Sequence, residues 1–417
     1  MSFKFAQAQI LKEEIYAAAT TKSEREKFKQ YFYQKTITET FRLPVTANTE
    51  YEFESALWNV TQFLYTSPLV YQGIYNLFSN YDRLSNTVRQ ALLEATYAVY
   101  PTQFQSAIKK LALKEKDPRL FAMEILYLQR SNPTQNKYLQ NLLKKRFKDY
   151  YKNDLLVETR NWLQKKLMPG NKLPSLIALF RHQQKHGYKI IYSFQRWNRD
   201  YPGLAIVQNA DGSFAKNEKG DLRTFQQLAR SATNLPYFIT NGNTPQGIYS
   251  IQGIGKSKNT FIGPTPNFQL VMPNETSELI FFHQKSDTTT YLTDYKKLLP
   301  PSWQLYSPIY ETFAAGKIGR TEIIAHGTTV DPVFFKGKNF YPISPTLGCL
   351  CAREIWNEET GKLKESEMFD LINVFSSTPD TNGFLIVINL DNQQKPVTQA
   401  EIKALVKKFE NNKPFKQ

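Results

Sequence analysis

The chain has only two cysteines among its 417 residues, Cys349 and Cys351. This excludes a disulfide framework, because a bridge between residues two apart is geometrically unfavourable. The sequence also lacks any window of about 18 consecutive apolar residues, so it predicts no transmembrane segment. Residues 1–5 lack the basic start, apolar stretch and cleavage site of a secretory signal. Either the protein is cytosolic or the sequence begins after a removed signal.

Positive charge and apolar residues are plentiful. Lys and Arg number 53 against 37 Asp and Glu, a net charge of +16, and 41% of residues are hydrophobic. The excess of positive charge is concentrated in residues 141–200, which contain 14 Lys and Arg against 4 Asp and Glu. Such a surface attracts polyanions, although a solvated helix face explains it equally well. Because no nucleic-acid recognition motif accompanies the charge, we expect no nucleic-acid partner.

The first 190 or so residues have a helical pattern. Residues 83–100, 117–130 and 135–151 carry apolar side chains at spacings of three and four. The segments that begin at Val88 and Pro118 resemble each other thirty positions apart, and Tyr97 and Tyr127 keep that offset. The resemblance predicts stacked helical hairpins, as in solenoid repeats, and a plain helical bundle fits the same pattern.

The pattern changes near Tyr201, where short β-branched or aromatic runs alternate with Gly, Pro and Asn. The runs predict strands at residues 204–207, 236–240, 247–251, 279–283, 322–325 and 383–389, followed by a helix at 398–409. We therefore predict a multi-domain α+β protein, with a helical domain at 1–200 and a β-rich domain at 201–417. Residues 203–417 are expected to fold without the helical half.

Three short motifs follow one another in the β-rich part. They are Thr-Pro-Gln-Gly-Ile-Tyr at 244–249, Ile-Ala-His-Gly-Thr at 324–328 and Ser-Pro-Thr-Leu-Gly-Cys-Leu at 344–350. In this order they resemble the L,D-transpeptidase, or YkuD-like, family over roughly residues 203–395. The chain departs from the family pattern at Leu347, where His is common, and at Cys351, where Arg or Asn is common. The 23 residues from His326 to Cys349 also exceed the usual spacing, which predicts an inserted loop.

The resemblance implies an enzyme of the periplasm or cell surface that acts on peptidoglycan stem peptides. Cys349 would hold the donor stem as a thioester, and an amine would resolve it, giving a 3→3 cross-link or an anchored protein. Members of the family are also acylated by carbapenems. The alternatives are a hydrolytic L,D-carboxypeptidase or endopeptidase of the same fold, and a non-catalytic wall-binding scaffold in which the helical half recruits partners.

The residues themselves support a cysteine nucleophile. A free thiol is mostly protonated at neutral pH, so Cys349 needs a base, and His326 is the histidine closest to it in sequence. A backbone carbonyl beside Gly327 is expected to orient the imidazole, and the amides of Gly348 and Cys349 to face a developing oxyanion. We expect the pKa of Cys349 to be lowered by His326.

Three further residues are candidate substrate contacts. Arg353 is the nearest cation after Cys349 and would pair with a substrate carboxylate, although a surface arginine is an equal alternative. Tyr310 stands where the family often has a pocket aromatic, and a core role is the alternative. Thr346, within the cysteine motif, is the third candidate.

Other motifs are weaker. Residues 250–257 miss the phosphate-loop pattern at its first glycine. His182 and His186 share a helix face, but Gln183 stands where a metalloprotease needs Glu. A metal on the two cysteines would need two further ligands that the sequence does not offer nearby. We therefore expect no cofactor and no metal.

Overall fold

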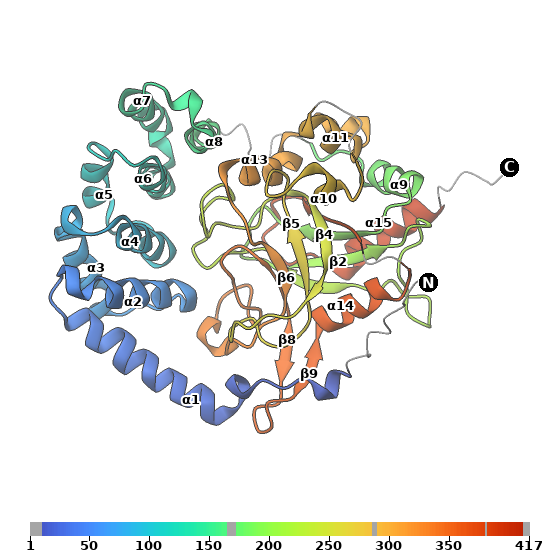
Figure 1. Cartoon of the computed structure of the whole chain (residues 1–417), viewed down its shortest axis with the longest axis horizontal. Helices are drawn as coiled ribbons and strands as arrows, with labels where there is room; N and C mark the ends of the chain where they lie inside the picture. The colour runs from blue at the N-terminus through green and yellow to red at the C-terminus, as the bar shows by residue number, and fades with distance from the viewer. Residues whose placement is uncertain (1–10, 165–171, 286–289, 380–381, 412–417) are drawn as a thin grey trace.

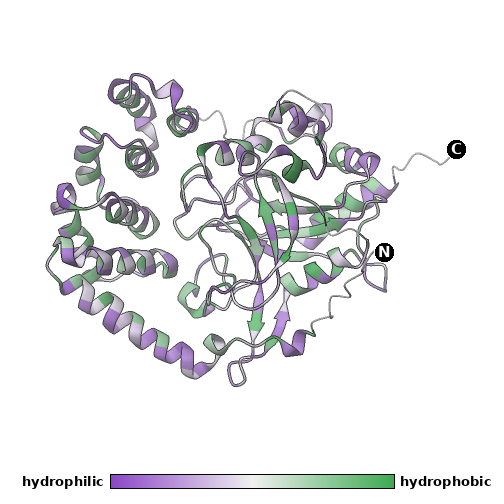
Figure 2. Ribbon diagram, in the orientation of Figure 1, coloured by the Kyte–Doolittle hydropathy of each residue, from purple (hydrophilic) through white to green (hydrophobic). Residues whose placement is uncertain are grey.

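The computed structural model describes residues 11–164, 172–285, 290–379 and 382–411. It consists of an arc of helices that packs against one side of a β-barrel surrounded by further helices (Figure 1). The barrel strands carry many hydrophobic residues interspersed with polar ones, whereas α1 is largely hydrophilic (Figure 2). A multi-domain α+β layout is therefore confirmed at this level.

Within the described residues, the N-terminal arc has eight α-helices. They are α1 (Lys22–Tyr31), α2 (Glu50–Phe63), α3 (Pro68–Ser79), α4 (Asn86–Val99), α5 (Gln105–Ala112), α6 (Pro118–Ser131), α7 (Asn136–Arg146) and α8 (Asp154–Leu163). Several begin at a capping side chain, for example Ser67 before α3 and Asp117 before α6. Helices α2, α4, α6 and α8 pack in succession, with α3, α5 and α7 at their outer side (Figure 1).

The stacked arrangement agrees with the internal resemblance. The two similar segments became α4 and α6, which are neighbours. Tyr97 and Tyr127, at equal offsets, are both buried, and the Arg130 guanidinium lies over the Tyr97 ring at 4.5 Å from its centroid. Stacking buries apolar faces that a single hairpin would leave exposed.

Eight strands close into a barrel in the order β1-β10-β4-β5-β6-β7-β3-β2. The barrel strands are β1 (Ile190–Gln195), β2 (Gly203–Gln208), β3 (Phe225–Leu228), β4 (Gly247–Gly255), β5 (Asn267–Val271), β6 (Ile324–His326), β7 (Leu350–Ala352) and β10 (Gly383–Asn389). A separate hairpin joins β8 (Glu354–Trp356) to β9 (Leu363–Ser366). Closure pairs both edges of every barrel strand.

Seven α-helices belong to the barrel half in the described residues. They are α9 (Leu176–His186), α10 (Glu278–Phe282), α11 (Tyr291–Lys297), α12 (Pro301–Gln304), α13 (Glu311–Ile318), α14 (Glu367–Ser376) and α15 (Gln399–Asn411). Side chains of α9 and α15 share a buried cluster with those of β1 and β10. The helix predicted at 398–409 is thereby confirmed as α15.

The predicted boundary at residue 200 falls after the first barrel strand. Helix α9 and strand β1 precede residue 200, yet β1 pairs with β10 and with β2. The barrel half therefore begins before residue 176. Residues 190–195 escaped prediction because the change from helical to β pattern was placed near Tyr201, so the segment before it was assigned to the helical half.

Two predicted strands are wrong. Residues 279–283 form α10, where the Ser277 hydroxyl accepts the Ile280 amide and caps the helix. Residues 236–240 form an irregular turn, in which the Ile239 amide donates to the Pro236 carbonyl. The strands predicted at 204–207, 247–251 and 383–389 are confirmed, and only the end of 322–325 is a strand, β6.

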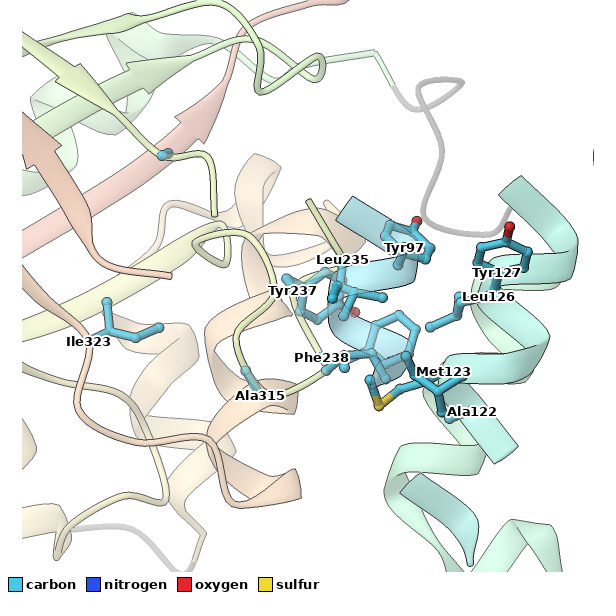
Figure 3. Packing of buried hydrophobic residues seen from close by; sticks show 14 of the residues in the cluster. Tyr97, Ala122, Met123, Leu126, Tyr127, Leu235, Tyr237, Phe238, Ala315 and Ile323 are labelled. Carbon is cyan, nitrogen blue, oxygen red and sulfur yellow. The ribbon is translucent and has the colours of Figure 1, made fainter. Parts of the chain in front are cut away.

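The turn at 236–240 packs against the helical arc and so joins the cores of the two halves. Leu235, Tyr237 and Phe238 point toward α4 and α6, where Tyr97 and Met123 lie (Figure 3). The Tyr237 hydroxyl also donates to the Glu158 carboxylate of α8 at 2.8 Å. One hydrophobic cluster therefore runs from the helical arc into the barrel.

Candidate active site

Cys349 and His326 lie at the ends of two adjacent strands. His326 is the last residue of β6, and Cys349 immediately precedes β7. The two strands are parallel, with Ala325 opposite Leu350. Both side chains line one cavity of about 260 Å³. The structure thus places the predicted nucleophile and base in the lining of one cavity. Across the strands His326 is paired with Cys351, and in the described residues no hydrogen bond joins the Cys349 and His326 side chains.

Side chains from both halves of the protein enclose this cavity. The lining residues are Trp58, Gln62, Asn241, Asn259, Phe261, Ile262, Thr321, Glu322, His326, Thr328, Val330, Pro345, Thr346, Leu347 and Cys349. Trp58 and Gln62 come from α2, and the Gln62 amide donates to the Pro345 carbonyl at 3.4 Å. The helical arc therefore forms one wall of the cavity. Sequence reasoning missed this wall because α2 and the cysteine motif are far apart along the chain.

The Cys349 thiol is held by backbone groups. Its sulfur accepts the Ile324 amide at 3.5 Å and donates to the Glu322 carbonyl at 3.6 Å. Burial raises the pKa of Cys349, and the positive charge of Arg320 only partly opposes this effect. The expected lowering of the Cys349 pKa is therefore wrong. A thiol that stays protonated needs a base during attack.

His326 is buried and oriented to accept a proton at Nε2. Its Nδ1 donates to the Gly327 carbonyl, which leaves Nε2 as the proton acceptor. The orienting carbonyl beside Gly327, expected from the sequence, is thus that of Gly327 itself. Burial lowers the pKa of His326 to about 4, so the imidazole is neutral at physiological pH. A neutral imidazole can accept the thiol proton.

The turn after His326 depends on Glu354, which the sequence analysis missed. The Glu354 carboxylate accepts the Thr328 amide at 2.8 Å and the Ser366 hydroxyl at 2.6 Å. A Cβ atom at Gly327 would lie 2.1 Å from the Glu354 Cδ, so a larger residue there would displace the Glu354 carboxylate. Burial raises the pKa of Glu354 to about 7. Glu354 therefore positions the carbonyl that orients His326.

The turn before Cys349 is stabilised by Thr346. The Thr346 hydroxyl accepts the Gly348 amide at 3.1 Å and donates to the Cys349 carbonyl at 2.8 Å. Because the Gly348 amide is already bonded, the oxyanion role expected for it is not supported. Thr346 lines the cavity, but its hydroxyl is occupied by the turn. Thr346 therefore fixes the backbone conformation of residues 346–349, which we call the cysteine turn.

The Thr-Pro-Gln-Gly motif lies beneath the same turn. The Thr244 hydroxyl donates to the Gly348 carbonyl at 2.8 Å. Gly247 has a φ of +129°, and a Cβ atom there would lie 2.2 Å from the Thr312 hydroxyl. The hydrogen bond from Thr244 to the Gly348 carbonyl explains physically why the first motif accompanies the cysteine motif.

Arg320 is a buried cation next to the cysteine turn and was also missed. Its guanidinium donates to the carbonyls of Gly242 and Asn243, each at 3.0 Å, and to that of Tyr237. A Cβ atom at Gly348, whose φ is +120°, would lie 2.3 Å from Arg320 Nη2. Arg320 therefore holds the 237–243 segment beside the cysteine turn, and its charge favours the Cys349 thiolate.

Two expected substrate contacts lie outside the cavity lining. Arg353 pairs with Glu365 at 2.8 Å and with Glu367 at 3.6 Å. The Tyr310 hydroxyl donates to the Gln304 carbonyl at 2.8 Å, and its ring packs on Tyr295. Both residues therefore have structural partners, and the alternative of a core role fits Tyr310.

The remaining candidates show no assembled site. Cys351 is 0% exposed within the hydrophobic cluster. The His182 and His186 rings are neighbours on α9, tilted by 49°, and His182 Nε2 bonds the Lys297 carbonyl at 2.9 Å. Residues 250–255 belong to β4 rather than to a loop before a helix. Within the described ranges, no group of three His, Cys, Asp or Glu side chains could hold a metal ion.

Comparisons with known proteins leave the family open. No family model matches. No curated protein matches the chain, and neither does any solved structure. In the part of the chain that the structure describes, no helix is long and apolar enough to span a membrane.

Proposed function

We propose that the protein is a cysteine acyltransferase of the L,D-transpeptidase type, with Cys349 as nucleophile and His326 as base. The observation that carries the proposal is the single cavity that both side chains line, at the ends of two paired parallel strands. The three motifs support it, because Thr244 and Gly348 are hydrogen-bonded across the turn that presents Cys349.

Acylation would proceed from neutral partners. His326 Nε2 takes the thiol proton while the Cys349 sulfur attacks a peptide carbonyl, and a C–S bond forms. The C–N bond of the leaving residue then breaks, and His326 returns the proton to the departing amine. The Cys349 amide is the candidate donor to the oxyanion, because Thr346 occupies the amide of Gly348.

The resolving nucleophile would decide the product. An amine that attacks the thioester gives a new amide and restores the thiol, whereas water gives a free carboxylate. Peptidoglycan stem peptides, in the periplasm or at the cell surface, are the substrates proposed on the strength of the motif resemblance. A protein amine is the second possible acceptor.

Defined muropeptides test this proposal directly. We expect that incubation with a disaccharide tetrapeptide yields a covalent protein adduct and releases the terminal D-residue, both detected by mass spectrometry. Dimers would identify a transpeptidase and shortened monomers a carboxypeptidase. Recovery of unchanged muropeptide, with no adduct on the protein, would instead support a binding scaffold.

The pH dependence of acylation should reflect the depressed pKa of His326. Because burial lowers that pKa to about 4, His326 stays neutral down to mildly acidic pH. We expect kcat/KM for adduct formation to be flat between about pH 5 and 8 and to fall below it as His326 becomes protonated. Stopped-flow or quenched mass measurements would show this, with circular dichroism as a folding control. An acidic limb centred on the ordinary value of 6.5 would contradict the prediction.

A further inference from the structure

The cavity at Cys349 differs in charge from the protein as a whole. The chain has 53 Lys and Arg against 37 Asp and Glu, yet no Lys or Arg is among the cavity-lining residues in the described ranges. The lining has one carboxylate, Glu322, and three side-chain amides, Gln62, Asn241 and Asn259. Carboxylate and amide oxygens accept hydrogen bonds from a cation, so the lining suits a positively charged ligand.

Glu322 occupies a constrained position next to the nucleophile. Its φ is +62°, a conformation that costs energy for a residue with a side chain, and its amide donates to the Glu275 carboxylate at 2.9 Å. Its carbonyl accepts the Cys349 thiol. No ion pair joins the exposed Glu322 carboxylate to a cation in the described part of the chain. Glu322 also raises the pKa of Cys349, although less than burial does. Because a carboxylate at this position disfavours the Cys349 thiolate, activation of the nucleophile does not explain the presence of Glu322.

Trp58 lies on the wall that α2 contributes. Its ring centroid is 5.8 Å from that of Phe261, and both side chains line the cavity. The bond from Gln62 to the Pro345 carbonyl fixes α2 against the cysteine motif. Tryptophan presents the most favourable aromatic face to an ammonium group, and the attraction increases when water is excluded.

We propose that Glu322 and Trp58 form a binding site for the ammonium group of the acyl acceptor. This inference rests on the proposed acyltransferase function and makes the helical arc part of the active site. During transfer the acceptor nitrogen forms a bond to the thioester carbonyl and the C–S bond breaks. Of the two protons that the ammonium group loses, one goes through His326 to the Cys349 sulfur and the other to solvent.

Protection of Cys349 from alkylation tests the site without any turnover. The full-length protein would be labelled with iodoacetamide in the presence of Nα-acetyl-lysine methylamide or of its uncharged norleucine analogue, and labelling of Cys349 followed by tandem mass spectrometry. We expect the lysine compound to slow labelling and the norleucine compound to have little effect. Glu322→Gln should weaken protection about threefold, in the range of an exposed ion pair, and Trp58→Leu should weaken it similarly.

Two variants serve as controls. Tyr51→Ala changes α2 at a residue that is 79% exposed and outside the cavity lining, so protection should stay unchanged. Glu322→Asp keeps the charge and should retain most of the protection. Equal protection by both compounds, or full protection in Glu322→Gln, would overturn the proposal. Protection that depends on Glu322, in a protein that forms no adduct with muropeptides, would uphold the ammonium site and reject the acyltransferase function.

Discussion

Cys349→Ala is expected to abolish covalent adduct formation with both muropeptides and a carbapenem, because no other thiol lines the cavity in the described structure. His326→Ala should lower the rate by at least about 100-fold, as expected for loss of a general base. The matched control is Cys351→Ala. Cys351 is fully buried, and burial raises its pKa far above the ordinary value. The Cys351→Ala variant should therefore still form the adduct.

Intact mass and peptide mapping separate the two cysteines. Cys351→Ala removes a small buried side chain, so a modest loss of thermal stability is expected alongside retained reactivity. An adduct mapped to Cys351, or one that forms at full rate in Cys349→Ala, would overturn the assignment of the nucleophile.

A fragment of residues 203–417 is expected not to fold, contrary to the prediction from the sequence alone. It lacks β1, which lies between β10 and β2 in the barrel. Ile190, Ile191, Tyr192 and Phe194 of that strand are completely buried. Each such side chain contributes about 1.5–3 kcal/mol, a total similar to the about 5–15 kcal/mol stability of a typical domain. The fragment also exposes two unpaired strand edges.

Comparison with a fragment of residues 172–417 isolates the role of this strand. The longer fragment restores α9 and β1 but still lacks the helical arc. We expect it to be more soluble and to unfold in urea with a sharper transition than 203–417. Because the hydrophobic cluster extends into the arc, the longer fragment should remain less stable than the whole chain. A monomeric 203–417 fragment with cooperative unfolding would contradict the importance of β1.

The sequence predicted those parts of the fold that carry a periodic pattern. Helices α4 and α6 were found from the spacing of apolar residues, and strands β2, β4 and β10 from β-branched or aromatic runs bounded by Gly, Pro and Asn. The turn at 236–240 was mistaken for a strand because its aromatic residues serve the interface with α4, α6 and α8 instead of a sheet. Local β propensity does not distinguish these two uses.

For the site, the sequence predicted the groups that carry out the chemistry but not those that position them. Cys349 and His326 were indicated by residue type and by motif order. Glu354 accepts a backbone amide of the turn after His326, and Arg320 donates to backbone carbonyls of the 237–243 segment; such contacts leave no local motif. The cavity wall from α2 depends on tertiary packing between segments 283 positions apart. Only the folded structure brings these residues together.

Trp58 and Gln62 lie on a helix outside the barrel, so the two sides of the cavity can change independently during evolution. The nucleophile and base lie next to turns that allow little variation, because a side chain at Gly348 would be strained and one at Gly327 would displace the Glu354 carboxylate. The facing wall comes from a helix whose other surface is exposed to solvent, as Tyr51 shows. Substitutions on α2 can therefore change the shape and charge of the cavity while the catalytic turns stay intact. New ligand preferences can arise on this helix at little cost to the barrel.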